Sequence, residues 1–172
     1  FYIVDETTSM TKQDLNGTKL VTMDLSVKLG KEEPLVLIYH THGSETYKKV
    51  NGKEGSVIEV GTALTKELEN VYGIKTVHDK SVYDMVDGQL DRNAAYNFAG
   101  DSVEAALRKN PSVKVVIDLH RDSVENNIHL RTKVNGKSAA QIMFFNGVSR
   151  LASKGDIGYL YNPNKEANLA FS

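Results

Sequence analysis

Residues 34–45 read PLVLIYHTHGSE, a continuous apolar run that follows a proline and ends in two histidines and a glutamate. An uninterrupted run of this kind is typical of a β-strand that is buried on both faces of a sheet. The pattern returns at residues 113–122, which read VKVVIDLHRD. The sequence therefore predicts two buried strands, each followed directly by histidine.

Helical patterns separate the predicted strands. Ser56 and Glu59 have the spacing of a capping box, and apolar residues then recur three and four positions apart until Gly73. A short strand is expected at residues 74–78, and a second helix at residues 93–110. The residues expected to face the sheet are Val57, Val60, Leu64, Leu68 and Val71 in the first helix and Phe98, Val103, Ala106 and Leu107 in the second.

The order of these elements indicates the class of fold. Strand, helix, strand, helix and strand along the chain predict right-handed βαβ units. They favour an α/β fold with a mostly parallel sheet and helices on both faces. Asn135-Gly136, between residues 128–134 and 137–145, is a strong signal for an additional β-hairpin.

The two ends of the chain carry weaker patterns. Residues 1–33 mix short apolar stretches with turn signals, and we expect an N-terminal arm, with one or two short strands, packed on a domain of residues 34–172. Residues 165–171 have the pattern of a helix that reaches Ser172 without a cap, so we expect this domain to be truncated at its C-terminus. A start at Phe1 without methionine is likewise expected of a fragment.

Composition narrows the possible functions. The chain of 172 residues has a formal net charge of −1 and contains neither cysteine nor tryptophan. This balance provides no basic surface, which excludes nucleic acid as a main partner. The apolar run before the first histidine motif, residues 35–39, is far shorter than the ~20 residues of a membrane span. Without cysteine, any metal site must use His, Asp and Glu.

His42 and His120 each follow a predicted buried strand at its carboxyl end, where open α/β sheets collect their ligand sites. Two histidines and a carboxylate, with a fourth position left for water, are the composition of a catalytic zinc site. Zinc would lower the pKa of its bound water to ~7 and polarise a scissile carbonyl group. The residues alone leave two candidates open for the carboxylate: Glu45 in the loop after His42, and Glu59 in the first turn of the next helix.

Two more residues are expected to support such a site. His40 should lie on the same side of its strand as His42 but deeper in the sheet, where it would not bind the ion. Asp118 should share a face with His120 and accept a hydrogen bond from the ring nitrogen that does not bind metal. Both would orient the ligands rather than join them.

Further polar residues near the motifs allow more than one interpretation. Arg121 and Asp122 form either an ion pair at the rim or, in the case of Arg121, a binding group for a substrate carboxylate. Both are auxiliary catalytic candidates. We expect His78 and His129 to have ordinary structural roles, since neither has a comparable motif beside it.

Three stretches resemble one protein family. The motif HTHGSE at residues 40–45, IEVG at residues 58–61 and IDLHRD at residues 117–122 are similar to the stage II sporulation protein P family, and the similarity covers nearly the whole chain. This family resembles the zinc N-acetylmuramoyl-L-alanine amidases of the amidase-3 fold. The resemblance implies an amidase-3-like, zinc-dependent hydrolase that cleaves peptidoglycan between N-acetylmuramic acid and L-alanine, with possible endopeptidase activity.

The resemblance also implies a cellular setting. It implies an enzyme that acts in engulfment during endospore formation, outside the cytoplasm, at the mother-cell membrane facing the forespore septum. Its attachment to the membrane would depend on an anchor that is absent from this chain. The implied partners are the peptidoglycan substrate, the lytic transglycosylase stage II sporulation protein D and the membrane protein stage II sporulation protein M.

A set of site residues follows from the same resemblance. By their position in the amidase-3 pattern, His42, Glu59 and His120 are expected to bind the Zn²⁺ ion. Glu45 would then lie behind the ligands or face the substrate. The amidase-3 fold carries a further glutamate, the expected general base, on a strand near the C-terminus, and here we expect it beyond Ser172.

Two other functions stay open at this point. A different zinc metallopeptidase or a deacetylase could use the same three ligands and differ only in its substrate. A cell-wall binding fragment that keeps the motifs but is catalytically incomplete is the other alternative.

Overall fold

The computed structural model describes residues 5–8, 10–11, 13–28, 30, 32–48, 52–125, 128 and 130–172. The chain divides into two compact units, one formed by Val27–Asn126 and the other by Phe1–Ser26 together with Asn127–Ser172. Both histidine motifs belong to the first of these units. The division into an arm of residues 1–33 and a domain of residues 34–172 stays a prediction.

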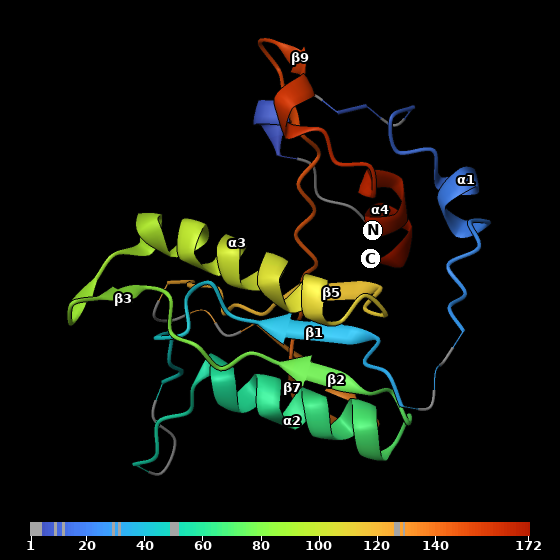
Figure 1. Cartoon of the computed structure of the whole chain (residues 1–172). Coiled ribbons are helices and arrows are strands. Elements are labelled where there is room, and N and C mark those ends of the chain that lie inside the picture. The colour runs from blue at the N-terminus through green and yellow to red at the C-terminus, as the bar shows by residue number, and fades with distance from the viewer. Residues whose placement is uncertain are drawn as a thin grey trace. The chain divides into compact units, whose positions relative to one another are not determined.

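A three-stranded parallel sheet is the centre of the unit Val27–Asn126 (Figure 1). Its strands are β1 (Val36–Tyr39), β2 (Thr76–His78) and β5 (Val115–Asp118), in the order β2-β1-β5. In the middle strand, Ile38 pairs with His78 of β2 and, on the other side, with a residue of β5. The predicted parallel sheet is therefore confirmed, and it contains all three predicted strands.

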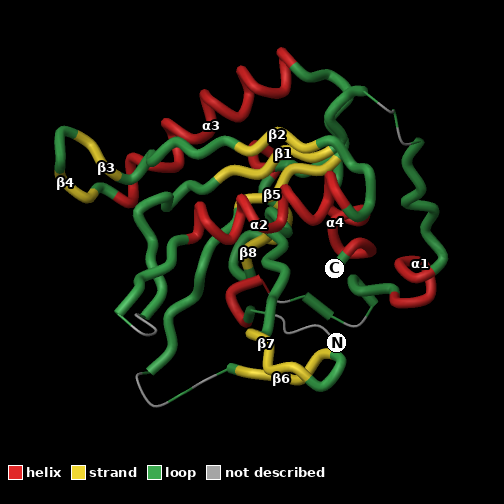
Figure 2. The backbone as a smooth tube through the Cα atoms, turned by 90° about the horizontal axis from the view of Figure 1, so that it is seen from below, coloured by secondary structure: helices red, strands yellow, loops and turns green. Residues whose placement is uncertain are grey.

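Two helices lie on opposite sides of this sheet, α2 (Val57–Asn70) and α3 (Arg92–Lys109) (Figures 1 and 2). α2 begins with the predicted capping box, in which the Ser56 hydroxyl accepts a hydrogen bond from the Glu59 N–H and the Glu59 carboxylate accepts one from the Ser56 N–H. The carboxylate of Asp91 caps the first turn of α3. The predicted placement of helices on both faces is confirmed.

Aliphatic side chains hold α2 on the sheet. Val36 and Ile38, which are 5% and 0% exposed, form a core cluster with Leu35, and the α2 residues Leu64 and Leu68 pack against it. Full burial of an aliphatic side chain of this size contributes about 1.5–3 kcal/mol. The apolar stripe of α2 therefore accounts for its position over β1 and β2.

The prediction is wrong for three of the side chains expected to face the sheet. Val60, Val71 and Phe98 are 41%, 61% and 48% exposed. Val71 follows the last residue of α2, so the helix no longer directs it inward. In α3 the buried face is formed by Ala95 and Ala99 instead. Phe98 points away from this face because consecutive residues are turned by about 100° around a helix.

The predicted β-hairpin around Asn135-Gly136 is confirmed. It joins β6 (Arg131–Val134) to β7 (Lys137–Ala140) in an antiparallel pair. The φ angles of Asn135 and Gly136 are 51° and 77°, and a two-residue type I′ turn requires positive φ at both positions. Asn and Gly adopt such angles at low cost, which explains why this dipeptide predicts the turn.

Two shorter hairpins have only two residues in each strand. One joins β3 (Met85–Val86) to β4 (Gln89–Leu90) and belongs to the unit with the parallel sheet. The other joins β8 (Arg150–Leu151) to β9 (Gly155–Asp156) and belongs to the other unit. Neither hairpin is among the elements that the sequence predicts.

Short helical segments complete the second unit. They are η1 (Glu6–Thr8), α1 (Gly17–Val21), η2 (Gly158–Leu160) and α4 (Lys165–Phe171). The helix predicted at residues 165–171 is thus confirmed as α4. α1 contacts α4, and Lys19 forms an ion pair of 2.6 Å with Glu166.

The described part of residues 1–33 contains η1 and α1 in place of the expected short strands. The reason lies at Asn16, whose side-chain oxygen accepts a hydrogen bond from the Lys19 N–H and so caps α1. Asn16-Gly17 therefore begins a helix, although such dipeptides more often mark turns between strands. The apolar stretch at residues 1–4 lies outside the described residues.

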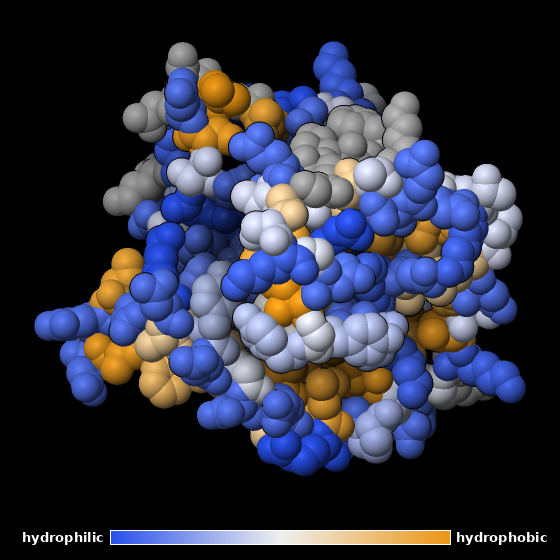
Figure 3. Space-filling model, turned by 90° about the horizontal axis from the view of Figure 1, so that it is seen from above, coloured by the Kyte–Doolittle hydropathy of each residue, from blue (hydrophilic) through white to orange (hydrophobic). Residues whose placement is uncertain are grey.

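The surface and the helices give two further observations. On the face that Figure 3 shows, hydrophobic side chains lie in separate patches among hydrophilic ones. Within the part of the chain that the structure describes, no helix combines the length and the apolar character that crossing a membrane requires. The face shown in Figure 3 therefore has no single dominant hydrophobic region.

Candidate metal centre

The carboxyl ends of β1 and β5 lie side by side. The two strands are parallel neighbours, and their last pair joins Tyr39 to Asp118. The chain that follows each strand therefore leaves the sheet at the same edge, which is where ligand sites of open α/β sheets form. This register brings the HTHGSE and DLHRD motifs together.

Reciprocal hydrogen bonds lock the two strand ends to each other. The ring Nδ1 of His40 lies 2.9 Å from the carbonyl oxygen of Leu119, and the N–H of Leu119 donates to the Tyr39 carbonyl at 2.9 Å. In the other direction, the N–H and hydroxyl of Thr41 donate to the two carboxylate oxygens of Asp118 at 2.9 and 2.6 Å. These hydrogen bonds fix the separation of the two strand ends from which His42 and His120 continue.

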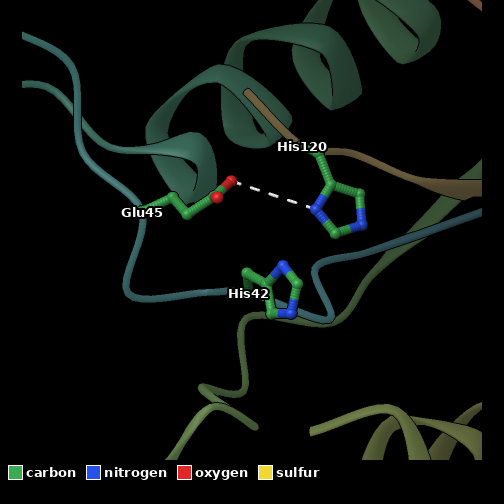
Figure 4. A group of neighbouring side chains, drawn as sticks. All are labelled: His42, Glu45 and His120. Atoms are coloured by element: carbon green, nitrogen blue, oxygen red, sulfur yellow. Dashed lines mark ion pairs between the residues drawn. The ribbon is translucent and has the colours of Figure 1, made fainter. Parts of the chain in front are cut away.

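Three side chains meet beyond the ends of β1 and β5: His42, Glu45 and His120 (Figure 4). One ligand atom from each lies within 4.8 Å of the other two. The centroids of the two imidazole rings are 5.0 Å apart, and Nδ1 of His120 lies 3.9 Å from Oε2 of Glu45. Two imidazole nitrogens and a carboxylate oxygen that converge in this way are a donor set suited to zinc.

Glu45 is the most buried member of the group, at 7% exposed. Its Oε2 accepts a hydrogen bond of 3.1 Å from the Arg121 N–H, and its Oε1 lies 3.9 Å from Nη1 of Arg92. A buried carboxylate is costly unless opposite charge or hydrogen bonds compensate it. Apart from His120, whose ring is charged only when it is protonated, one backbone donor and one distant, half-exposed guanidinium compensate it, so a cation between Glu45 and the histidines would stabilise this arrangement.

Asp118 orients His120. Its Oδ2 lies 2.9 Å from Nε2 of His120, which leaves Nδ1 as the ring nitrogen directed toward Glu45 (Figure 4). This is the predicted contact between the two residues, and the structure confirms it. A carboxylate on the far nitrogen fixes the tautomer and the ring orientation of a metal-binding histidine. The metal-binding role itself stays a prediction.

The electrostatics of this pair follow from the same contact. The hydrogen bond that His120 donates to the Asp118 carboxylate raises the pKa of His120 above its ordinary value. Burial acts to raise the pKa of Asp118, but hydrogen bonds from His120 and Thr41 outweigh it and leave that pKa lowered. Burial and the nearby Asp118 carboxylate raise the pKa of Tyr39 to about 12, so its hydroxyl stays protonated at neutral pH.

We expect His120 in the metal-free chain to titrate above 6.5, and Asp118→Asn to bring its pKa down. The carboxylate stabilises the imidazolium, so protonated His120 stabilises the fold below pH 6.5 for as long as Asp118 stays ionised, and this contribution is lost as pH rises through the raised pKa of His120. Chemical shifts of the histidine ring nuclei followed by NMR against pH would measure both values. His78 on β2, whose pKa is lowered by burial, is an internal control. An unchanged His120 titration in the Asp118→Asn variant would contradict the assignment.

Glu59 does not join the two histidines. Its carboxylate accepts the 2.9 Å hydrogen bond from the Ser56 N–H in the α2 cap and lines a shallow hollow of about 370 Å³ with Tyr47 and Gly55. The structure thus assembles a third member, Glu45, other than the one that the resemblance implies. The set His42, Glu59 and His120 stays a prediction.

The other candidates of the sequence lie around the group. His40 is 0% exposed, and its Nε2 lies 2.9 Å from Nε2 of His78. Its ring lies beside Gly61 of α2, whereas the ring of His42 meets Tyr96 of α3, so the two rings do not share a side as the sequence predicts. Arg121 provides its N–H to Glu45, and its guanidinium Nη1 donates to the Asp122 carbonyl at 3.4 Å. The auxiliary roles of Arg121 and Asp122 stay predictions. His129 lies outside the described residues.

Some residues at the site have no signal in the sequence. Arg92 and Tyr96 lie one turn apart on α3: the carbonyl of Arg92 is 3.4 Å from Nε2 of His42, and the Tyr96 ring meets the His42 ring edge-on at 5.3 Å. Asp84 is 0% exposed and accepts hydrogen bonds of 3.1 and 2.5 Å from the N–H and hydroxyl of Ser44. These contacts depend on tertiary structure, so spacing along the chain could not reveal them.

Gly43 allows the loop between His42 and Glu45 to pass close to another segment. A Cβ at this position would lie 2.9 Å from the carbonyl oxygen of Ser81 and 3.1 Å from the Cα of Val82. Both are backbone atoms that cannot move aside easily. Packing therefore requires the glycine of the HTHGSE motif, and no pattern in the sequence predicts this requirement.

The fold and the site together define an α/β protein with a candidate metal centre at the carboxyl edge of a parallel sheet. The chain belongs to the stage II sporulation protein P family, whose model matches residues 3–172. Stage II sporulation protein P of Bacillus subtilis (strain 168) is 27% identical to it over 127 residues, which cover 67% of this chain and 31% of that protein. The chain thus spans about a third of the curated relative that it matches. No solved structure matches it.

Proposed function

We propose that this chain is the metal-binding part of a zinc-dependent peptidoglycan hydrolase that acts in engulfment during sporulation. The observation that carries the proposal is the convergence of His42, Glu45 and His120 at the carboxyl edge of the sheet. Membership of the stage II sporulation protein P family supports a role in sporulation. The bond that we propose it cleaves is the amide between N-acetylmuramic acid and L-alanine.

Three protein ligands would bind the ion and leave a further coordination position open toward solvent. A zinc ion there would activate water and polarise the scissile carbonyl. Asp118 would hold His120 in the tautomer that presents Nδ1, and the Arg121 N–H would fix the Glu45 carboxylate. The part of the protein described here would thereby fix the geometry of the centre before the substrate arrives.

The surface above the centre suggests how the substrate would be held. Tyr96 and Arg92 are exposed on the first turns of α3, and both lie against members of the group. A tyrosine ring offers a face for a sugar, and a guanidinium offers donors to carbonyl or carboxylate oxygens. Sugar rings and carbonyl or carboxylate oxygens are the groups that a glycan strand with an attached peptide presents.

The proposed setting follows from the family alone. We propose that the whole protein works outside the cytoplasm, anchored to the mother-cell membrane. Its proposed partners are stage II sporulation proteins D and M. Co-purification of the three proteins from sporulating cells, with the whole protein and with a variant that lacks this chain, would test these contacts.

Product analysis tests the proposed reaction. We expect purified peptidoglycan treated with the zinc-loaded protein to release peptides with a free N-terminal alanine and glycan strands free of peptide. His42→Ala and treatment with a chelator should both reduce release to background, because each empties the centre. Mass spectrometry of the products would separate this outcome from cleavage within the peptide or loss of an acetyl group.

The matched control for this measurement is Glu67→Gln, a change on the exposed face of α2. It should release the same products at the same rate as the unchanged protein. Cleavage only between amino acids would support a metallopeptidase, and binding to the cell wall without any product would support a binding fragment.

A further inference from the structure

Two histidines face each other behind the candidate centre, on the side of the sheet that α2 covers. His40 follows the last residue of β1, and His78 is the last residue of β2. Their Nε2 atoms are 2.9 Å apart, and their rings meet edge-on with centroids 5.2 Å apart. His40 is 0% exposed and His78 is partly buried. Neither belongs to the group of candidate metal ligands.

The direction of the hydrogen bonds follows from their partners. Nδ1 of His40 lies 2.9 Å from the Leu119 carbonyl, which can only accept, so this nitrogen must carry the hydrogen. In a neutral His40 ring the other nitrogen, Nε2, is then an acceptor. His78 must therefore donate from its own Nε2. The chain of donors runs from His78 through His40 to the carbonyl of Leu119, the residue that follows β5.

Gly61 provides the space for this pair. It lies in the interior of α2, and a Cβ there would be 2.6 Å from Nε2 of His78 and 2.7 Å from Nε2 of His40. Glycine in the interior of a helix is ordinarily unfavourable compared with alanine. The two imidazole rings explain its presence, because any side chain at this position would separate them.

The cost of burying His78 argues against simple packing. Its Nδ1 is buried and has no hydrogen-bond partner among the described residues. An unpaired buried acceptor destabilises a protein, and an apolar side chain of similar size would avoid this cost. A histidine at position 78 donates a hydrogen bond to His40, which an apolar residue could not do.

We propose that His78 and Gly61 are positioning residues for the metal centre. His40 precedes the candidate ligand His42 by two residues, and the carbonyl that His40 holds belongs to Leu119, next to His120. By fixing the ring of His40, His78 sets the spacing between the two segments that present the histidine ligands. This role rests on the proposed metal centre.

The matched variants His78→Gln and His78→Leu test the proposal. The side-chain amide of glutamine can donate to Nε2 of His40, whereas leucine cannot donate at all. We expect the leucine variant to bind Zn²⁺ about 10-fold more weakly than the unchanged chain, the lower range for loss of an outer partner of a metal ligand. The glutamine variant should retain most of the affinity. The absorption spectrum of bound Co²⁺ should shift in the leucine variant alone.

A second pair of variants uses glycines in helices. Gly61→Ala should weaken Zn²⁺ binding by a similar factor, since the added Cβ overlaps both rings. Gly100→Ala in α3 is the control, because a Cβ there meets no atom within 4 Å. It should leave Zn²⁺ binding unchanged and the unfolding temperature the same or higher, as expected for Gly to Ala in a helix.

The metal-free chain provides a measurement that needs no ion. In ¹⁵N NMR spectra of the histidine rings we expect His40 to carry its hydrogen on Nδ1 and His78 on Nε2. A scalar coupling between the two facing Nε2 nuclei should report the hydrogen bond. The opposite tautomers, or equal Zn²⁺ affinity of His78→Leu and the unchanged chain, would overturn the positioning role.

The outcomes separate this inference from the proposed function. If the unchanged chain binds Zn²⁺ and the leucine variant binds it equally well, the metal centre stands and the positioning role fails. If the unchanged chain binds no Zn²⁺, the metal centre fails, and the positioning role fails with it whatever the ¹⁵N spectra show.

Discussion

Glu45→Gln should remove most of the zinc affinity of this chain. Glu45 is the carboxylate that the structure places with His42 and His120, and glutamine has nearly the same shape but no charge. Loss of an outer partner of a metal ligand lowers the metal affinity by about 10–100-fold, and loss of a ligand itself should lower it further. Competition of the purified chain with a chromophoric chelator would measure the affinity.

The control is the same substitution at the other candidate, Glu59→Gln. This carboxylate belongs to the α2 cap, so its loss should reduce stability by about 1 kcal/mol and leave zinc binding intact. The reverse result, with zinc lost in the Glu59→Gln variant and kept in the Glu45→Gln variant, would establish the ligand set that the family resemblance implies. The pair therefore distinguishes the two sets directly.

Ile38→Ala should lower the free energy of unfolding by about 2–5 kcal/mol. Ile38 lies in the middle strand, is 0% exposed and belongs to the cluster against which α2 packs. Truncation removes buried apolar surface and leaves a cavity that the flanking strands cannot close. Urea unfolding followed by circular dichroism would measure the change.

Two further variants serve as controls for this measurement. Ile38→Val should cost only about 0.5–1.5 kcal/mol, because one methylene group is removed. Val116→Ala on β5 changes a side chain that is 43% exposed and should lie within about 0.5 kcal/mol of the unchanged chain. Equal losses for Ile38→Ala and Val116→Ala would mean that the core does not lie where the structure shows it.

The elements of the fold could be predicted because their signals are local. The apolar runs at residues 36–39 and 115–118, the capping box of Ser56 and Glu59, and the Asn135-Gly136 turn each act within a few residues of the chain. Parallel strands joined by helices then leave few topologies to choose from. For the same reason, His42 and His120 could be expected at one edge of the sheet.

The membership of the site could not be predicted in the same way. From the sequence, Glu45 and Glu59 are equivalent candidates, one in the loop after His42 and one at the start of the next helix. Which of the two carboxylates lies beside the histidines depends on the path of that loop. Two contacts hold the loop in place: the hydrogen bond of Ser44 to the buried Asp84 and the close approach of Gly43 to Ser81. These contacts join segments about 40 residues apart.

The sequence by itself determined the three strands of the parallel sheet, the helices α2, α3 and α4, the hairpin at Asn135-Gly136 and the position of the two histidine motifs at the strand ends. Tertiary structure alone decided that Glu45 completes the group and that His78, beneath it, faces His40 across Gly61. The physical reason is the range of the interactions. Turns, caps and periodicity act between near neighbours, whereas a metal site depends on distances of a few ångströms between residues that only the packed sheet and helices bring together.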